Sequence, residues 1–170
     1  MFVLGVDPGL SRCGYGAVMK KDGKVEAVAG GIIASDPAMA LPERLRGLLE
    51  ELEALVGELR PDAVAVERVF FQTNARTAMA TGQASGLALV AAAASGCEVV
   101  QYTSNEVKVS VVGYGGATKD QVQRMVASLL GMAEPPRPPD VADALALALC
   151  HLASEPTRRA VARAGARGPA

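Results

Sequence analysis

The sequence contains no tryptophan, one histidine and only three cysteines among its 170 residues. Cys13, Cys97 and Cys150 are odd in number, lie far apart and form no Cys-x-x-Cys pair. This spacing predicts neither a disulfide framework nor a zinc site, and free thiols fit a reducing cytoplasm. With so few imidazole and thiolate groups, a metal site in this chain would be built from oxygen ligands.

Long hydrophobic runs are also missing. The longest uninterrupted apolar segment, residues 87–94, is far shorter than the ~20 residues that span a bilayer. The N-terminus has no basic segment ahead of its apolar residues, as a secretory signal would have. The sequence therefore predicts a soluble, cytoplasmic protein without a membrane segment.

Neither sign of charge is in excess, because 17 Lys and Arg stand against 18 Asp and Glu, for a net charge of −1. The basic residues are unevenly placed: residues 156–170 hold four arginines and no acid. Nucleic-acid-binding domains often carry a basic excess, so composition does not favour such a ligand. If DNA is bound, Lys and Arg must gather on one face, and metal ions must offset any clustered carboxylates.

Hydrophobic patterning in the first half predicts a sheet. Residues 2–7 form an apolar run, and residues 14–19 and 24–34 flank Asp22-Gly23, a strong hairpin signal. We therefore expect three strands in an antiparallel meander. Apolar residues at spacings of three and four then predict an amphipathic helix from Leu41 that ends before Pro61. The buried strand that follows, residues 63–67, would return the chain to the sheet.

The second half alternates helices with one further strand. Residues 75–95 are rich in Ala, Gly, Ser and Thr, which predicts a helix that another element can approach closely, in a packed or dimeric interface. From residue 155 the basic tail is expected to be disordered. One α/β layered domain with a mixed sheet is expected over residues 1–154. Its remaining elements are predicted as a strand over 98–102 and helices over 104–112, from 118, and from 141 to about 153.

Two acids are expected at the carboxyl ends of strands, where open α/β sheets place their functional sites. Asp7 ends the first strand, and Glu67 ends the strand that follows the amphipathic helix. A crossover helix allows these two strands to be parallel neighbours. Their carboxylates would then project from the same edge of the sheet and could share a cation.

A second acidic pair lies at the start of the last predicted helix. Asp140 and Asp143 are spaced i, i+3, which places both side chains on one face of the first turn. The same spacing also fits an acidic capping box, with Asp140 as N-cap and Asp143 at the third helical position. Taken with Asp7 and Glu67, however, the pair completes an oxygen-only cluster. Such a cluster suits Mg²⁺ or Mn²⁺, and two ions of this kind can support phosphodiester cleavage.

Several short segments together resemble the RuvC family of Holliday-junction endonucleases. Each segment is weak alone, but their order and spacing agree with the family over about residues 1–153. The segments are Val3-Leu4-Gly5-Val6-Asp7-Pro8-Gly9-Leu10, Val66-Glu67, Gly113-Tyr114-Gly115 with Lys119, and Asp140-Val141-Ala142-Asp143-Ala144-Leu145-Ala146.

The resemblance implies a ribonuclease-H-like three-layer fold with a mixed five-stranded sheet flanked by helices. It also implies a homodimer that nicks two opposed strands of four-way junction DNA with Mg²⁺, for which Mn²⁺ can substitute, using two ions per site. A RuvA–RuvB branch-migration complex is implied as a partner. The resemblance assigns the metal site to Asp7, Glu67, Asp140 and Asp143, of which Asp140 occupies a position that is sometimes histidine in the family.

The resemblance also implies roles for two lysines. Lys119 matches a family position close to the catalytic centre, where an ammonium could contact the scissile phosphate or the leaving oxygen. Lys108 matches a basic family position near DNA. By itself, each residue would be interpreted as a solvated surface lysine.

The segment after Glu67 supplies further candidate DNA contacts. Phe70 and Phe71 are two of only six aromatic residues, and one of them could stack on an unpaired base at the junction centre. The family resemblance favours Phe70, and the alternative is that both are buried or lie in a dimer contact. Arg76 could reach a phosphate, although an arginine at a helix start is usually only solvated. His151, in the last helix, is expected to pack rather than to bind a metal.

Two other functions fit part of the sequence. A strand leading into Asp-x-Gly also builds the phosphate loop of actin-like and sugar-kinase folds, but those proteins enclose ATP between two such domains and this chain has room for one. A junction-binding module without catalysis would use its acids only as caps. Asp7→Asn separates this last function from a nuclease, because a nuclease variant should still bind four-way DNA without cutting it.

Overall fold

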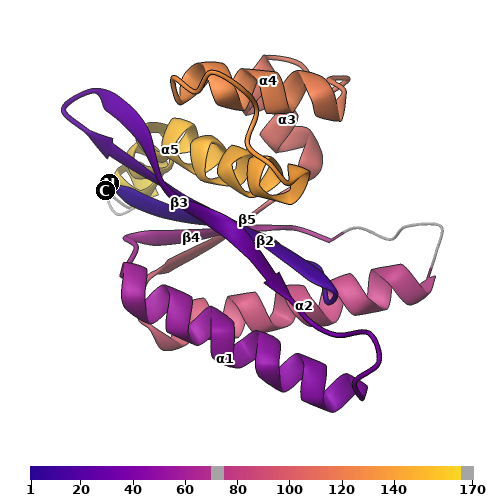
Figure 1. The fold of residues 1–170 in the computed structure, drawn as a ribbon. Coiled ribbons are helices and arrows are strands. Elements are labelled where there is room, and N and C mark those ends of the chain that lie inside the picture. Colours follow the sequence, from indigo (N-terminus) through magenta and orange to yellow (C-terminus); the bar gives the residue numbers. More distant parts are fainter. Residues whose placement is uncertain (70–74, 166–170) are drawn as a thin grey trace.

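The protein is described here by a computed structural model that covers residues 1–69 and 75–165. Its middle layer is a mixed sheet of five strands in the order β3-β2-β1-β4-β5 (Figure 1). β1 pairs antiparallel with β2 and parallel with β4, and β4 pairs parallel with β5. The predicted meander, crossover and mixed sheet are confirmed. The strands are β1 (Phe2–Asp7), β2 (Arg12–Lys21), β3 (Lys24–Ala34), β4 (Ala63–Glu67) and β5 (Glu98–Tyr102).

The turn between β2 and β3 follows the sequence signal for a tight hairpin. Asp22 and Gly23 both adopt positive φ angles, of 51° and 80°, as a two-residue turn that matches the twist of the strands requires. β2 is longer than expected, because its pairing with β3 continues to Lys21 at one end and begins at Arg12 at the other.

Helices cover both faces of the sheet, which gives three layers (Figure 1). Alternating residues of β1 divide the core between the two faces: Val3 belongs to the cluster under α3, α4 and α5, and Leu4 to the cluster under α1 and α2. This alternation is expected for a strand that is buried on both sides. The helices are α1 (Leu41–Leu59), α2 (Ala75–Ala94), α3 (Ser104–Val112), α4 (Lys119–Leu129) and α5 (Pro139–Gly165).

Glycines in β1 and β2 let α5 lie directly on the strand backbones. A Cβ atom on Gly5 would overlap the carbonyl group of Ala144, and one on Gly14 would overlap that of Asp140. At Gly16 an added Cβ would lie 2.6 Å from Cγ of Leu145. This close approach brings the acidic first turn of α5 to the end of β1 that carries Asp7.

The predicted bounds of α5 are wrong, and the alternative role of Asp140 as its N-cap is not found. The helix begins at Pro139, so Asp140 lies inside its first turn and is not the N-cap. It also does not end near Ala153: it continues through Pro156 to Gly165, so residues 155–165 are helical rather than disordered. The extension is held by ion pairs of Arg158 with Glu98 on β5 and of Arg159 with Glu155.

α2 is the only helix of the described residues that is long and apolar enough to cross a membrane, with a mean hydropathy of 1.2. A single such helix is weak evidence for a membrane segment, since length and composition alone meet the criterion. α2 buries Ala84, Ala88 and Ala91 in the core cluster that it shares with α1. Its outward side carries Met79 and Val90, which are 67% and 56% exposed.

Candidate active site

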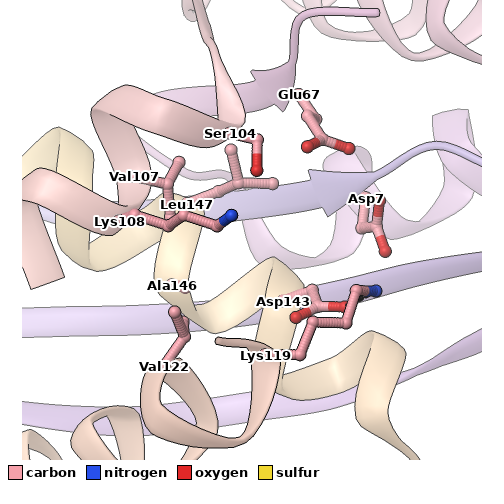
Figure 2. Close-up of a pocket in the computed structure, with 10 residues that line it drawn as sticks. All are labelled: Asp7, Glu67, Ser104, Val107, Lys108, Lys119, Val122, Asp143, Ala146 and Leu147. Carbon is pink, nitrogen blue, oxygen red and sulfur yellow. Dashed lines mark hydrogen bonds and ion pairs between the residues drawn. The ribbon is translucent and has the colours of Figure 1, made fainter. Parts of the chain in front are cut away.

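The carboxyl ends of β1 and β4 place two acids side by side. The parallel register pairs Val6 with Val66, so Asp7 and Glu67 are the next residues on neighbouring strands. Both side chains line one cleft at this edge of the sheet (Figure 2). The sequence prediction that they share an edge is confirmed.

α5 and α4 contribute the other charged groups of the cleft. Asp143 comes from the first turns of α5, and its Oδ2 lies 3.2 Å from Nζ of Lys119. Lys119 is the first residue of α4 because Thr118 caps that helix: the Thr118 hydroxyl accepts a hydrogen bond from the amide of Gln121, and the Gln121 side chain accepts one from the amide of Thr118. This capping box fixes where the Lys119 side chain leaves the backbone.

α3 lines the remaining side of the cleft. It starts with a second capping box, between Thr103 and Glu106, directly after β5. Ser104 and Lys108 from this helix line the cleft, as Figure 2 shows. The walls are completed by apolar side chains of α3, α4 and α5: Val107, Val122, Ala146 and Leu147.

Crowding of the acids changes their proton affinity. Burial, with the neighbouring charges of Glu67 and Asp143, raises the pKa of Asp7 from 3.8 to about 7. Burial also raises the pKa of Glu67, with a further contribution from Asp143, while a hydrogen bond with Asp7 and the charges of Lys119 and Lys108 oppose this rise. The same acids, Asp143 first, raise the pKa of Lys119 and keep it a cation. With all three acids ionised, the cleft would hold one more negative charge than Lys108 and Lys119 neutralise, and the raised pKa values reflect this crowding.

Asp140 occupies a different position from the other three acids. It does not line the cleft; its Oδ2 accepts a hydrogen bond from Nη2 of Arg12 at 3.0 Å. It is close enough for its charge to contribute to the raised pKa of Asp7, although as the smallest of the contributions. The structure therefore brings Asp7, Glu67 and Asp143 together and leaves Asp140 beside them in an ion pair.

The oxygen-only donor set fits a hard divalent cation. Within residues 1–69 and 75–165, no three acidic, histidine or cysteine side chains are already arranged to hold a metal ion, so the fit rests on the chemistry of the donors. The raised pKa of Asp7 has the charges of Glu67 and Asp143 among its causes, and a bound cation would relieve that repulsion. Carboxylates on three separate elements, with space between them, suit an ion that keeps several water ligands, as Mg²⁺ does.

The other predicted residues lie away from this cleft or outside the described part of the chain. Arg76 is exposed in the first turn of α2. Phe70 and Phe71 fall outside the described residues. His151 is fully buried, with Nδ1 3.0 Å from the hydroxyl of Tyr102, which confirms a packing role.

Two residues at the site were missed by sequence reasoning. Ser104 follows the end of β5, and the rule that directed attention to the ends of β1 and β4 applies to that strand as well. Arg12 follows the turn after Asp7, but its partner Asp140 is 128 residues away. No local pattern in the sequence indicates that pairing.

A mixed five-stranded sheet between two helical layers, with acids at the carboxyl ends of adjacent central strands, defines a ribonuclease-H-like nuclease. The sequence profile described as crossover junction endodeoxyribonuclease RuvC matches residues 3–151. The chain belongs to the RuvC family.

Individual relatives support this membership over the whole fold. The crossover junction endodeoxyribonuclease RuvC of Salinispora arenicola is 52% identical, over 98% of this chain and 96% of that protein. The structure of Thermus thermophilus RuvC is similar with a TM-score of 0.84 and 36% identity, covering 92% of this chain and 96% of that one. T. thermophilus RuvC in complex with a Holliday junction substrate gives a TM-score of 0.86 and 37% identity, covering 91% and 94%.

Proposed function

We propose that this protein is a structure-specific DNA endonuclease that resolves four-way junctions in the cytoplasm by paired nicks in opposed strands, during recombination and repair. The observation that carries the proposal is the convergence of Asp7, Glu67, Asp143 and Lys119 in one cleft, in a chain of the RuvC family. A junction-bound structure of a 37% identical relative supports the choice of substrate.

Divalent cations would be held by Asp7, Glu67 and Asp143, with Asp140 joining them when its pairing with Arg12 is released. Mg²⁺ is the expected ion and Mn²⁺ its substitute, with two ions per site. When bound, such ions orient the attacking water and stabilise the leaving oxygen of a phosphodiester. The candidate ligands are all carboxylate oxygens, with no histidine or cysteine among them, and such ligands suit Mg²⁺ and Mn²⁺.

Two lysines of the cleft can bind a phosphate group of DNA. The Lys119 side chain is 80% exposed, although its ammonium group forms an ion pair with Asp143. It is therefore accessible to a DNA strand that enters the cleft and can donate a hydrogen bond to a phosphate oxygen. Lys108, on the opposite wall, offers a second positive charge in the same cleft. These lysines meet the requirement that an acidic protein must gather its basic groups where DNA binds.

Paired nicks require two active sites, which a two-fold dimer supplies. We place the dimer contact on the outward side of α2. Met79, Gly82, Gly86 and Val90 are exposed there at spacings of three and four residues. An added Cβ would meet nothing within 4 Å at either glycine, so a second helix can approach this face closely. The RuvA–RuvB complex remains a proposed partner.

The deciding experiment compares a synthetic four-way junction with a linear duplex of the same sequence, in Mg²⁺ and in EDTA. We expect symmetrical cutting of the junction in Mg²⁺ only. Asp7→Asn should bind the junction without cutting it. Cutting that persists in EDTA, or equal cutting of both substrates, would contradict the proposed function.

A further inference from the structure

The ion pair between Arg12 and Asp140 joins two elements that meet beside the active site. Arg12 is the first residue of β2 and Asp140 lies in the first turn of α5. Their side chains are 54% and 28% exposed, with Nη2 and Oδ2 3.0 Å apart. The guanidinium therefore faces solvent next to a carboxylate that the family resemblance assigns to the metal site.

The turn that carries Arg12 is braced from α1. Nη2 of Arg44 donates to the Ser11 hydroxyl at 2.7 Å, and Nε of Arg44 donates to the Ser35 hydroxyl at 3.0 Å. The Ser35 hydroxyl in turn donates to the carbonyl of Leu10 at 2.5 Å. Since Leu10 and Ser11 connect Asp7 to Arg12, these bonds fix the backbone of Arg12 relative to the catalytic carboxylate.

Release of the Arg12 side chain from Asp140 requires little free energy. The Arg12 side chain is 54% exposed and that of Asp140 28%, and solvent screening at such a surface position keeps the contribution of an ion pair to stability small. A divalent cation at Asp140 would compete for the same carboxylate oxygens. The released guanidinium would remain on the first residue of β2, beside the acids of the cleft, and its planar donors match the oxygens of a phosphate.

We propose that Arg12 is a DNA phosphate-binding residue. In the cation-free protein its guanidinium is paired with Asp140, and the binding of a divalent cation to Asp140 releases it. The inference rests on the proposed function for its substrate and its cation. It assigns Arg12 a role that couples metal binding to DNA binding, and it explains why Asp140 is paired outside the cleft.

The first test measures junction binding by the full-length protein as a function of KCl, in Ca²⁺ and in EDTA. Each phosphate contact contributes about 0.9 to the slope of log affinity against log salt. Arg12→Gln should lower that slope by about 1 in Ca²⁺ and leave it unchanged in EDTA, and Arg12→Lys should retain it. Arg46→Gln is the matched control, because Arg46 is exposed and paired with Glu50 on α1, and its slope should not change in either condition.

The second test measures Mn²⁺ binding without DNA, by electron paramagnetic resonance. Arg12→Gln should bind Mn²⁺ about two- to fivefold more tightly, because a competing cation has been removed, and this gain should vanish in an Asp140→Asn background. Weaker Mn²⁺ binding would show that Arg12 positions Asp140 instead, and it would overturn the proposal. Equal salt slopes for Arg12→Gln and wild type in Ca²⁺ would also overturn it, as would an equal loss of slope in Ca²⁺ and EDTA. Neither measurement requires strand cutting, so failure of the proposed function is detected separately.

Discussion

The ammonium of Lys119 lies 3.2 Å from Oδ2 of Asp143, on a side chain that is 80% exposed. The Asp143 side chain is only 22% exposed, but solvent around the lysine screens the pair, so we expect it to contribute only about 0–1 kcal/mol to the free energy of unfolding. The pairing therefore does little for stability and positions a cation in the cleft that also holds Asp7 and Glu67.

Lys119→Met should separate these two roles. We expect junction cutting to fall about 10²-fold, as when a charge-stabilising donor is removed from an active site, while the unfolding midpoint in urea changes little. Single-turnover cutting and urea unfolding measure the two effects. Lys24→Met, at the exposed hairpin end of β3, is the control and should retain full activity. Wild-type cutting by Lys119→Met would remove this lysine from the mechanism.

Asp7 should make the stability of the cation-free protein depend on pH. Its pKa is about 7 in the folded state and near 3.8 when the chain is unfolded. The folded state therefore binds the extra proton between these values, and this contribution to stability is present at pH 4 and is lost as the pH rises through 7. Asp7→Asn removes the contribution and the repulsion together. The variant should melt above wild type at pH 8 in EDTA, by a margin that shrinks towards pH 4.

Thermal melts from pH 4 to 8 test this dependence. Mg²⁺ should raise the melting temperature of wild type at pH 8 and have little effect on Asp7→Asn, because only wild type retains the full carboxylate set. Glu53→Gln, an exposed acid on α1, controls for the loss of one negative charge. A margin between Asp7→Asn and wild type that stays constant across the pH range would contradict the raised pKa.

The strands and helices were predictable because each leaves a local pattern. Alternation, the Asp22-Gly23 turn and the spacing of apolar residues in α1 are properties of neighbouring residues. The positions of Asp7 and Glu67 followed from strand ends, since the parallel register of β1 and β4 brings those ends together.

Features that depend on contacts distant in sequence were not predictable. The pairing of Arg12 with Asp140 joins residues 128 positions apart. The continuation of α5 past Pro156 contradicts the usual effect of proline, and it is accompanied by the ion pair of Arg158 with Glu98 on a strand far away in the sequence. Local propensity predicts that the helix ends near Pro156, because it contains no information about contacts between residues that are distant in the sequence.

The contact of α5 with β1 should make Gly5 intolerant of a side chain. In Gly5→Ala the new methyl group would overlap the carbonyl of Ala144, so α5 must move or the helix must distort. We expect a loss of about 1–3 kcal/mol in the free energy of unfolding, as for other overpacked sites, together with weaker Mg²⁺-dependent cutting because Asp143 moves with the helix.

Gly47→Ala is the matched control, since Gly47 lies within α1 and an added Cβ meets nothing within 4 Å. That change should stabilise the protein by about 0.5–1 kcal/mol, because alanine is the better helix former. Urea unfolding of both variants gives the comparison. If Gly5→Ala were as stable as Gly47→Ala, the close packing of α5 on β1 would be refuted.

The proposed dimer contact on α2 can be tested with two valines that are equally exposed. Val90 on α2 and Val28 on β3 both have 56% of their surface exposed, so a glutamate costs each about the same in a monomer. If α2 forms the dimer, Val90→Glu buries a charge in the interface and should give monomers in light scattering, whereas Val28→Glu should remain dimeric. With a junction held in a supercoiled plasmid, the Val90→Glu monomer should release nicked circles instead of the linear product of paired cuts. A dimer that survives Val90→Glu would move the interface away from this face of α2.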